Sequence, residues 1–191
     1  MSARVGIYAG SYDPFTYGHL SVVEGALKVF DRVIIAIGVN PKKKGLFPIE
    51  ERKAMIRNTL QLADNETPGV FSSFGGAVKV EVTHFEGLLI DFAQIKHPST
   101  IVRGLRAVSD FEQEMSIADA NRKQCSEVQT IFIPAEARHA FVSSSTVKEL
   151  ALYPGSDLSP YVTDDVAKKL REALGSPKAV KKVLDPGDIP L

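Results

Sequence analysis

The sequence predicts an α/β fold in which a mainly parallel, five-stranded sheet is covered by helices on both faces. Strand-like runs alternate with helix-like runs along the chain, as they do in sheets built from βαβ units. The strand-like runs are rich in Val and Ile, which is typical of strands buried on both faces. With 191 residues, of which 44% are hydrophobic, the chain is long enough to form one well-buried domain.

The predicted elements follow one another in a regular order. We expect strands at residues 4–9, 32–39, 78–83, 100–103 and 129–134. We expect helices at residues 20–30, 49–62, 88–96, 110–125, 145–152 and 164–174. Residues 65–77 are rich in glycine and lack periodicity, which predicts an exposed loop. We expect residues 1–175 to form the domain and residues 176–191 to form a C-terminal tail.

Composition excludes several classes of protein. Lys and Arg together number 23, as do Asp and Glu, which argues against bulk electrostatic binding to nucleic acid or to a membrane surface. The single cysteine, Cys125, rules out an internal disulfide, and no Cys and His cluster suggests structural zinc. No segment approaches the length of a transmembrane helix, and the N-terminus resembles a strand rather than a signal peptide. We therefore expect a cytoplasmic protein without nucleic-acid or membrane partners.

The loop after the first predicted strand carries the strongest functional signal. It reads GSYDPFTYGHL over residues 10–20 and leads into a helix. Glycine allows close backbone approach, and the first turn of a helix offers unpaired N–H groups to an anion. His19 would stand on that turn and add a ring donor. The loop lacks the GxGxxG pattern of dinucleotide sites, and an ordinary turn with a structural histidine is the alternative to a phosphate site.

Two charged loops follow other strands and are expected at the same sheet edge. Residues 40–45 read NPKKKG, so a lysine could hold a phosphate there, although lysine runs are often only solvated. Arg103 and Arg106 follow the fourth strand and could grip a phosphate or a carboxylate. Alternatively, these arginines pair with acidic residues of the next helix, namely Asp110, Glu112 or Glu114.

A run of serines follows the fifth strand. Ser143, Ser144 and Ser145 precede an apolar helical run, so one of them is expected to cap the helix. Successive serines with free N–H groups also suit a polyphosphate. For His139, a surface position in the loop is at least as good an interpretation as a role in binding.

The segment from Thr16 to His19 resembles the (T/H)xGH signature of the nucleotidyltransferase superfamily. Together with RGLRAVSDFE and SSSTVKE, in matched order and spacing over about residues 4–174, it resembles the phosphopantetheine adenylyltransferase family. The resemblance implies a Rossmann-like nucleotidyltransferase domain over residues 1–175. It implies that ATP and 4′-phosphopantetheine give dephospho-coenzyme A and pyrophosphate. Mg²⁺ would arrive with ATP, coenzyme A would act as a feedback inhibitor, and the chain would form a homohexamer.

The resemblance also implies roles for particular residues. Catalysis is assigned to His19, Lys43 and Arg103. Binding of the acceptor is assigned to Ser11, Lys43, Leu89 and Arg103. ATP binding is assigned to Ser11, Tyr12, His19, Gly104, Leu105, Arg106, Glu114, His139, Ala140, Phe141, Val142, Ser143, Ser144 and Ser145. No metal ligand is expected from the protein.

The sequence departs from the family pattern in places, and other functions compete with this one. Ser11 stands where many members have threonine, and His139 stands where an aromatic residue is common. Residues 65–77 are longer than usual. One alternative is a related adenylyltransferase or cytidylyltransferase that uses nicotinate mononucleotide or a similar acceptor. Another is a nucleotide-binding regulator without catalysis, against which the retained Ser11, His19, Lys43 and Arg103 argue.

Overall fold

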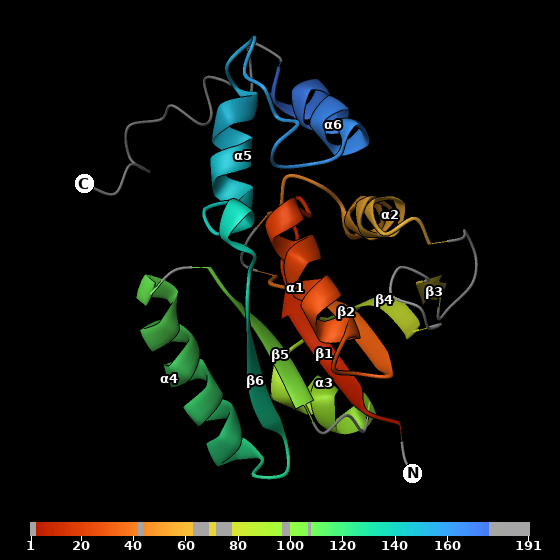
Figure 1. Cartoon of the computed structure of the whole chain (residues 1–191), viewed down its shortest axis with the longest axis vertical. Coiled ribbons are helices and arrows are strands. Elements are labelled where there is room, and N and C mark those ends of the chain that lie inside the picture. The colour runs from red at the N-terminus through yellow and green to blue at the C-terminus, as the bar shows by residue number, and fades with distance from the viewer. Residues whose placement is uncertain are drawn as a thin grey trace.

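A computed structural model describes residues 3–41, 44–62, 69–71, 78–96, 100–106 and 108–175. The strands form one sheet in the order β3-β4-β2-β1-β5-β6 (Figure 1). They are β1 (Val5–Gly10), β2 (Arg32–Val39), β3 (Gly69–Phe71), β4 (Val78–Glu86), β5 (Thr100–Leu105) and β6 (Gln129–Pro134). The five predicted strands are confirmed, and all of their pairings with one another are parallel.

Strand β3 corrects the prediction of a continuous loop over residues 65–77. It pairs antiparallel with β4 at the edge of the sheet, with Gly69 opposite Val80 and Phe71 opposite Val78. Three residues are too few to show the periodicity of a strand. The strand forms because these residues pair with β4. The remaining residues of that segment, like the predicted tail at 176–191, lie outside the described part of the chain.

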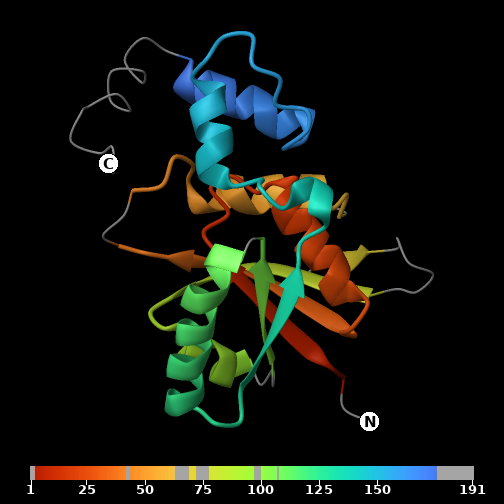
Figure 2. The same ribbon diagram turned by 60° about the vertical axis from the view of Figure 1, so that its left-hand side comes forward.

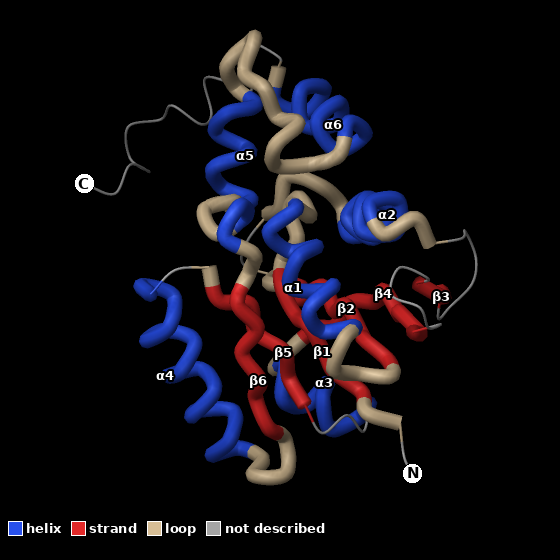
Figure 3. Tube along the Cα trace, in the orientation of Figure 1, coloured by secondary structure: helices blue, strands red, loops and turns tan. Residues whose placement is uncertain are grey.

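The helices form layers around the sheet. Helices α1 (Tyr17–Leu27) and α2 (Ile49–Thr59) cover one face, whereas α3 (Leu89–Lys96) and α4 (Val108–Gln124) lie on the other (Figure 2). Helices α5 (Ser144–Ala151) and α6 (Asp164–Leu174) lie beyond the carboxyl ends of the strands (Figure 3). The six predicted helices are confirmed. Helix α1 begins three residues before its predicted start, because Thr16 takes the N-cap position.

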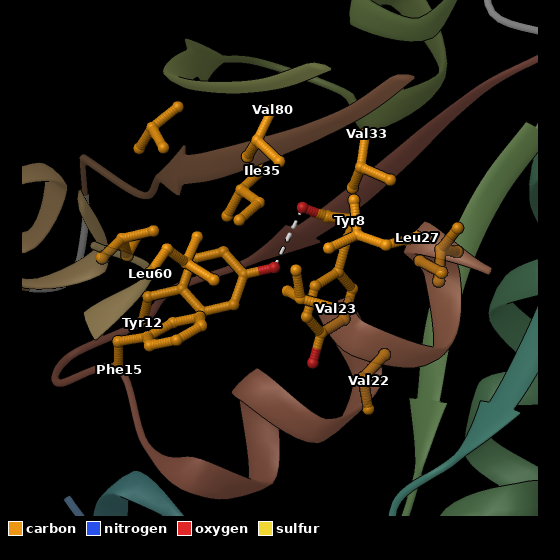
Figure 4. Close-up of a cluster of buried hydrophobic side chains, with 14 of the residues drawn as sticks. Tyr8, Tyr12, Phe15, Val22, Val23, Leu27, Val33, Ile35, Leu60 and Val80 are labelled. Atoms are coloured by element: carbon orange, nitrogen blue, oxygen red, sulfur yellow. Dashed lines mark hydrogen bonds between the residues drawn. The ribbon is translucent and has the colours of Figure 1, made fainter. Parts of the chain in front are cut away.

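Alternating residues of the buried strands form a core on each face of the sheet. Tyr8, Val33 and Ile35 pack under α1 and α2 (Figure 4). Ile7 and Ile34 point the other way, into the core that α3 joins. This division follows from the period of two in a strand. The helices described include none that is long and apolar enough to cross a membrane.

A third cluster lies outside the sheet. It joins α5 and α6 to the outer side of α2 and to the segments beside them, through Phe47, Met55, Val142, Val147, Ala151, Leu158, Val162, Val166, Leu170 and Leu174. This cluster fixes the start of α5 above the carboxyl ends of the strands. It therefore places the predicted serine segment over the β1–α1 loop.

Candidate active site

The predicted segments meet where the strand order reverses. The chain passes from β1 outward to β2 and β4, and then crosses back to β5 on the other side of β1. Ligands of open α/β sheets bind at such a switch point, outside the carboxyl ends of the strands. The loops after β1, β5 and β6 all lie at this edge (Figure 1).

His19 occupies the first turn of α1, as predicted. Its Nδ1 accepts the backbone N–H of Thr16 at 3.0 Å, and its ring packs against Tyr12 and Phe15 with ring centroids 5.1 and 5.4 Å away. Because Nδ1 is an acceptor, the neutral ring carries its proton on Nε2. Burial, aided by the charge of Arg106, lowers the pKa of His19 to about 3. His19 is thus a neutral N–H donor at pH 7.

Tyr12 is turned away from the site. Its backbone has a φ of 47°, its ring is buried, and its hydroxyl donates to the carbonyl of Tyr8 at 2.9 Å (Figure 4). The ring lies over Gly10, where a Cβ atom would come within 2.9 Å of it. The Tyr12 side chain is therefore unavailable for the nucleotide contact that the family resemblance implies.

Gly18 brings two segments of the site together. A Cβ atom at this position would lie 2.9 Å from the carbonyl oxygen of Val142 and 3.4 Å from that of His139. Only glycine allows the start of α1 to pack so closely against the backbone before α5. The glycine of the signature thus has a packing role beside the neighbouring histidine.

Arg103 is held in place by the protein itself. Its Nη1 donates to the carbonyl of Ala9 at 3.1 Å, and its Nε and Nη2 donate to the Glu114 carboxylate at 2.5 and 2.6 Å. Burial opposes the charge, but the Glu114 carboxylate outweighs burial and raises the pKa of Arg103. The ion pair that the sequence offered as an alternative is therefore present, with Glu114 as the partner.

The same arginine also lines a cavity, so pairing and ligand binding are compatible. The cavity measures about 590 Å³, and the predicted acceptor residues Ser11, Leu89 and Arg103 all line it. Its other walls are Ala9, Gly10, Gly38, Val39, Asn40, Pro41, Phe85, Gly87 and Leu88. Lys43, the remaining residue predicted to bind the acceptor, lies outside the described residues.

The three serines differ in their contacts. The Ser143 hydroxyl caps α5 by accepting the Thr146 N–H at 3.1 Å. The Ser144 hydroxyl donates to the carbonyl of Pro14 at 2.8 Å and so ties α5 to the β1–α1 loop. Ser145 is exposed. Capping accounts for one serine, as the sequence suggested, and contact with the signature loop accounts for a second.

His139 is not an ordinary surface histidine. It ends a short 3₁₀ helix, η1 (Ala137–His139), and its ring lies 5.7 Å from that of Tyr17. Its Nδ1 is buried and has no hydrogen-bond partner among the residues that the structure describes. Burial and the neighbouring Arg138 lower the pKa of His139.

The other predicted nucleotide residues flank this region. Gly104 allows β5 to approach α1, since its Cβ would lie 2.7 Å from Val22. The Leu105 carbonyl accepts the Ala135 N–H at 2.8 Å. Phe141 is 85% exposed, whereas Ala140 is half-buried. Within the described ranges, no group of three or more His, Cys, Asp and Glu residues could hold a metal ion.

Asp13 and Arg52 were missed by the sequence analysis. Both are buried, with 7% and 8% of their surfaces exposed. Asp13 accepts the backbone N–H groups of Leu46 and Phe47 at 2.7 and 3.0 Å, and Arg52 Nε lies 3.4 Å from its Oδ1. The signal available was an aspartate inside the GSYDPF segment, but nothing in the sequence indicates its distant partners.

Comparisons with known proteins identify the family of this chain. A cytidylyltransferase-like family model matches residues 7–150. The phosphopantetheine adenylyltransferase of Carboxydothermus hydrogenoformans is 44% identical, over 88% of this chain and 95% of that one. The corresponding protein of Alkaliphilus metalliredigens is 41% identical, over 87% of this chain and 97% of that one.

Solved structures show the same fold at lower identity. A Plasmodium falciparum nicotinic acid mononucleotide adenylyltransferase has a TM-score of 0.61 at 16% identity, covering 90% of this chain and 96% of that one. A bifunctional NMN adenylyltransferase/ADP ribose pyrophosphatase from Francisella tularensis has a TM-score of 0.64 at 17% identity, covering 94% of this chain and 52% of that one. By sequence and by fold, this chain belongs to the cytidylyltransferase-like nucleotidyltransferases and, among them, to the phosphopantetheine adenylyltransferase family.

Proposed function

We propose that the protein transfers the adenylyl group of ATP to 4′-phosphopantetheine, giving dephospho-coenzyme A and pyrophosphate. The observation that carries this proposal is the cavity of about 590 Å³ at the switch point. A fixed arginine lines it, and it opens at the sheet edge where the histidine loop lies. Relatives with 38–44% identity bear the name of this activity.

The acceptor phosphate is the nucleophile. Its second pKa is near ~6, so it is mostly dianionic at neutral pH and needs no general base. One of its oxygens bonds to the α-phosphorus of ATP as the bond to the bridging oxygen breaks, and pyrophosphate leaves with that electron pair. Arg103 and Lys43 hold the incoming phosphate and offset its repulsion from ATP.

His19 stabilises the charge that develops in the transition state. Its Nε2–H donates to an α-phosphoryl oxygen, while Thr16 holds the other ring nitrogen. A neutral donor that does not change protonation near pH 7 suits this role, because the reaction requires positioning and charge stabilisation rather than proton transfer.

The nucleotide occupies the side of the site formed by the end of β5 and the start of α5. We assign ATP contacts to Ser11, His19, the segment Gly104 to Arg106, Glu114, and the segment His139 to Ser145. The start of α5 receives the leaving pyrophosphate on its N–H groups. Mg²⁺ enters as the Mg·ATP substrate and is bound largely through phosphates and water.

Pyrophosphate release tests this function. Mg·ATP is supplied with 4′-phosphopantetheine, nicotinate mononucleotide or glycerol 3-phosphate as separate acceptors, and CTP is run in parallel. Release only with ATP and 4′-phosphopantetheine is the expected result. Release with a different acceptor would keep the mechanism and change the substrate. No release with any acceptor would favour a nucleotide-binding regulator.

We propose a homohexamer, as the family resemblance implies, and exposed apolar side chains on α4 and β6 offer a surface for contact between copies. Phe111, Met115 and Ile117 on α4 and Ile131 on β6 are each at least 37% exposed. Light scattering coupled to size-exclusion chromatography gives the mass directly, and a monomer at micromolar concentration would contradict this assembly.

We further propose that coenzyme A inhibits by competing at the acceptor and nucleotide positions, since it shares most of its structure with the product. We also propose that the reaction takes place in the cytoplasm, where ATP is available. Turnover measured with increasing coenzyme A tests the inhibition, and an unchanged rate would exclude it.

A further inference from the structure

We propose that Asp13 and Arg52 are positioning residues that fix the β2–α2 loop against the β1–α1 loop and so shape the acceptor cavity. This inference rests on the proposed function for its substrate, but its geometry is independent of it. Neither residue lines the 590 Å³ cavity. They act by holding the backbone of the two loops that contribute to the cavity wall.

Asp13 holds the β2–α2 loop by its backbone. Its two carboxylate oxygens accept from the N–H groups of Leu46 and Phe47, which lie just after the lysine-bearing segment. Charge-assisted hydrogen bonds of this kind are short and directional. Lys148 on α5 places a further positive charge 3.8 Å from Oδ2 of Asp13. One carboxylate therefore joins the β1–α1 loop, the β2–α2 loop and α5.

Arg52 ties the same two loops from the other side. Its Nε donates to the carbonyl of Phe47 at 2.7 Å, and its Nη1 donates to the carbonyl of Ser11 at 3.2 Å. Ser11 is itself part of the cavity wall. The guanidinium thus fixes the distance between a wall residue and the loop after β2.

Gly45 leaves the space that Arg52 occupies. A Cβ atom at position 45 would lie 1.5 Å from Nη2 of Arg52, so any side chain there must displace the guanidinium. This provides a variant that moves Arg52 without removing a charge. Glycine at this position is explained by the arginine rather than by backbone conformation, because position 45 has no positive φ.

The burial of this pair supports a positioning role. Burying a carboxylate and a guanidinium carries a desolvation cost that often cancels their attraction, so such a pair adds little net stability. Fixed placement of the groups around it is the remaining contribution. The backbone partners at positions 11, 46 and 47 all lie in the loops next to the cavity.

Glu81 supplies a matched control. It is also buried, with 6% of its surface exposed, and it pairs with Arg32 and with Lys96. Arg32 begins β2, so this cluster lies toward the amino end of the strand, away from the carboxyl edge. Substituting Glu81 disrupts a buried ion pair without touching the loops of the site.

The experiment compares Asp13→Asn and Gly45→Ala with Glu81→Gln in the full-length protein. For the first two we expect kcat/KM for 4′-phosphopantetheine to fall by roughly 10–100-fold, as for a displacement of about 1 Å, mainly through a higher KM. We expect the KM for ATP to change by less than about twofold. Glu81→Gln should lower Tm and leave both KM values unchanged.

Amide hydrogen exchange at Leu46 and Phe47 gives a readout that does not require turnover. Asp13→Asn should accelerate exchange there, and Glu81→Gln should not. Unchanged exchange would overturn the inference whatever the activity. Equal rises in both KM values, or a loss confined to Tm, would do so as well. If wild-type protein released pyrophosphate only with another acceptor, the proposed substrate would fail and the same comparison would be made with that acceptor.

Discussion

The acceptor end of the site and the nucleotide end reach the same sheet edge by different means. The acceptor end is built from the ends of β1 and β2, the turn before α3, and Arg103 on β5. The proposed nucleotide end combines the end of β5 with η1 and the start of α5, which lie off the sheet, and α5 rests on the cluster that it forms with α2 and α6. Arg103 is fixed by two strands and Glu114, whereas the α5 start is tied down by Ser144 and by contact with Gly18.

We expect this difference in support to distinguish the two proposed substrate positions. The proposed acceptor cavity is lined by strand ends, which the sheet holds in place, and by the turns that follow them. At the proposed nucleotide end, the start of α5 and the segment before it are held to the β1–α1 loop and the start of α1 by a few contacts. We propose that His19, on the first turn of α1, acts on the reacting phosphorus rather than on either substrate alone.

Removing the shared donor should have the largest effect. His19→Ala is expected to raise the barrier by about 2.7–4 kcal/mol, because one preorganised donor to the developing charge is lost. Steady-state kcat with saturating Mg·ATP and 4′-phosphopantetheine measures this, with Tm as the control for folding. Nearly full turnover by a folded His19→Ala protein would exclude the catalytic role.

Arg103→Ala should affect the acceptor end selectively. Loss of its hydrogen bonds to a charged phosphate is worth about 1.5–3 kcal/mol, which predicts a roughly 10–100-fold fall in kcat/KM for 4′-phosphopantetheine. The KM for ATP should change much less. Because the variant leaves the Glu114 carboxylate unpaired, Tm is measured as the control for folding. Equal damage to both substrates would count against the division of the site.

The pH dependence of turnover should reflect protonation of the acceptor phosphate rather than of a group on the protein. Below the second phosphate pKa of about 6, kcat/KM for the acceptor should fall about tenfold per pH unit as the dianion is lost. His19, with a pKa of about 3, stays neutral over this range, so it causes no change in kcat/KM near pH 6.5. The residual activity of His19→Gln should therefore show the same fall in kcat/KM below pH 6. If that fall were absent in the variant, a neutral His19 would be contradicted.

The same pKa has a consequence for folding. In the unfolded chain the pKa of His19 returns to its ordinary value near 6.5, so the unfolded state binds a proton first as the pH falls. The free energy of unfolding should thus decrease from pH 6.5 toward pH 3. Denaturant titrations of wild type and His19→Gln at several pH values should show a shallower decrease for the variant.

The smallest effects are expected at the nucleotide end. Ser143→Ala removes the cap of α5 and should cost about 1 kcal/mol of stability. Ser144→Ala removes the hydrogen bond to Pro14 and should cost about 0.5–1.5 kcal/mol while raising the KM for ATP more than that for the acceptor. Chemical denaturation and steady-state kinetics measure the two quantities. A larger effect on the acceptor would show that the two ends are not separate.

Local patterns predicted most of the fold, and distant pairings account for what they missed. Alternation of strand and helix patterns was sufficient for five strands and six helices, and His19 was correctly expected on the first turn of α1. Strand β3 depends on its neighbour in the sheet, so its three residues carry no signal of their own. Tyr12 looked like a loop residue, but a positive φ turns its ring into the core.

The contacts of Asp13 and Arg52 were beyond prediction for a related reason. Their partners include backbone groups of residues 11, 46 and 47. Every residue has these backbone groups, so the amino-acid sequence does not show which of them bind Asp13 or Arg52. The pairing of Arg103 was foreseen as one of two alternatives, because Glu114 lies on the helix that follows it. The partners Arg103 and Glu114 lie close in the sequence, so their ion pair could be predicted. Asp13 and Arg52 lie far apart in the sequence, so theirs could not.

Gly18 has an implication for how this site can change over evolution. It packs against main-chain oxygens of residues 139 and 142. This contact between the start of α1 and the segment before α5 therefore does not depend on the side chains of residues 139–142. Phe141, which is 85% exposed, can therefore be exchanged without altering this contact. We therefore expect the surface beside the proposed nucleotide site to vary while the packing of α1 against the segment before α5 stays the same.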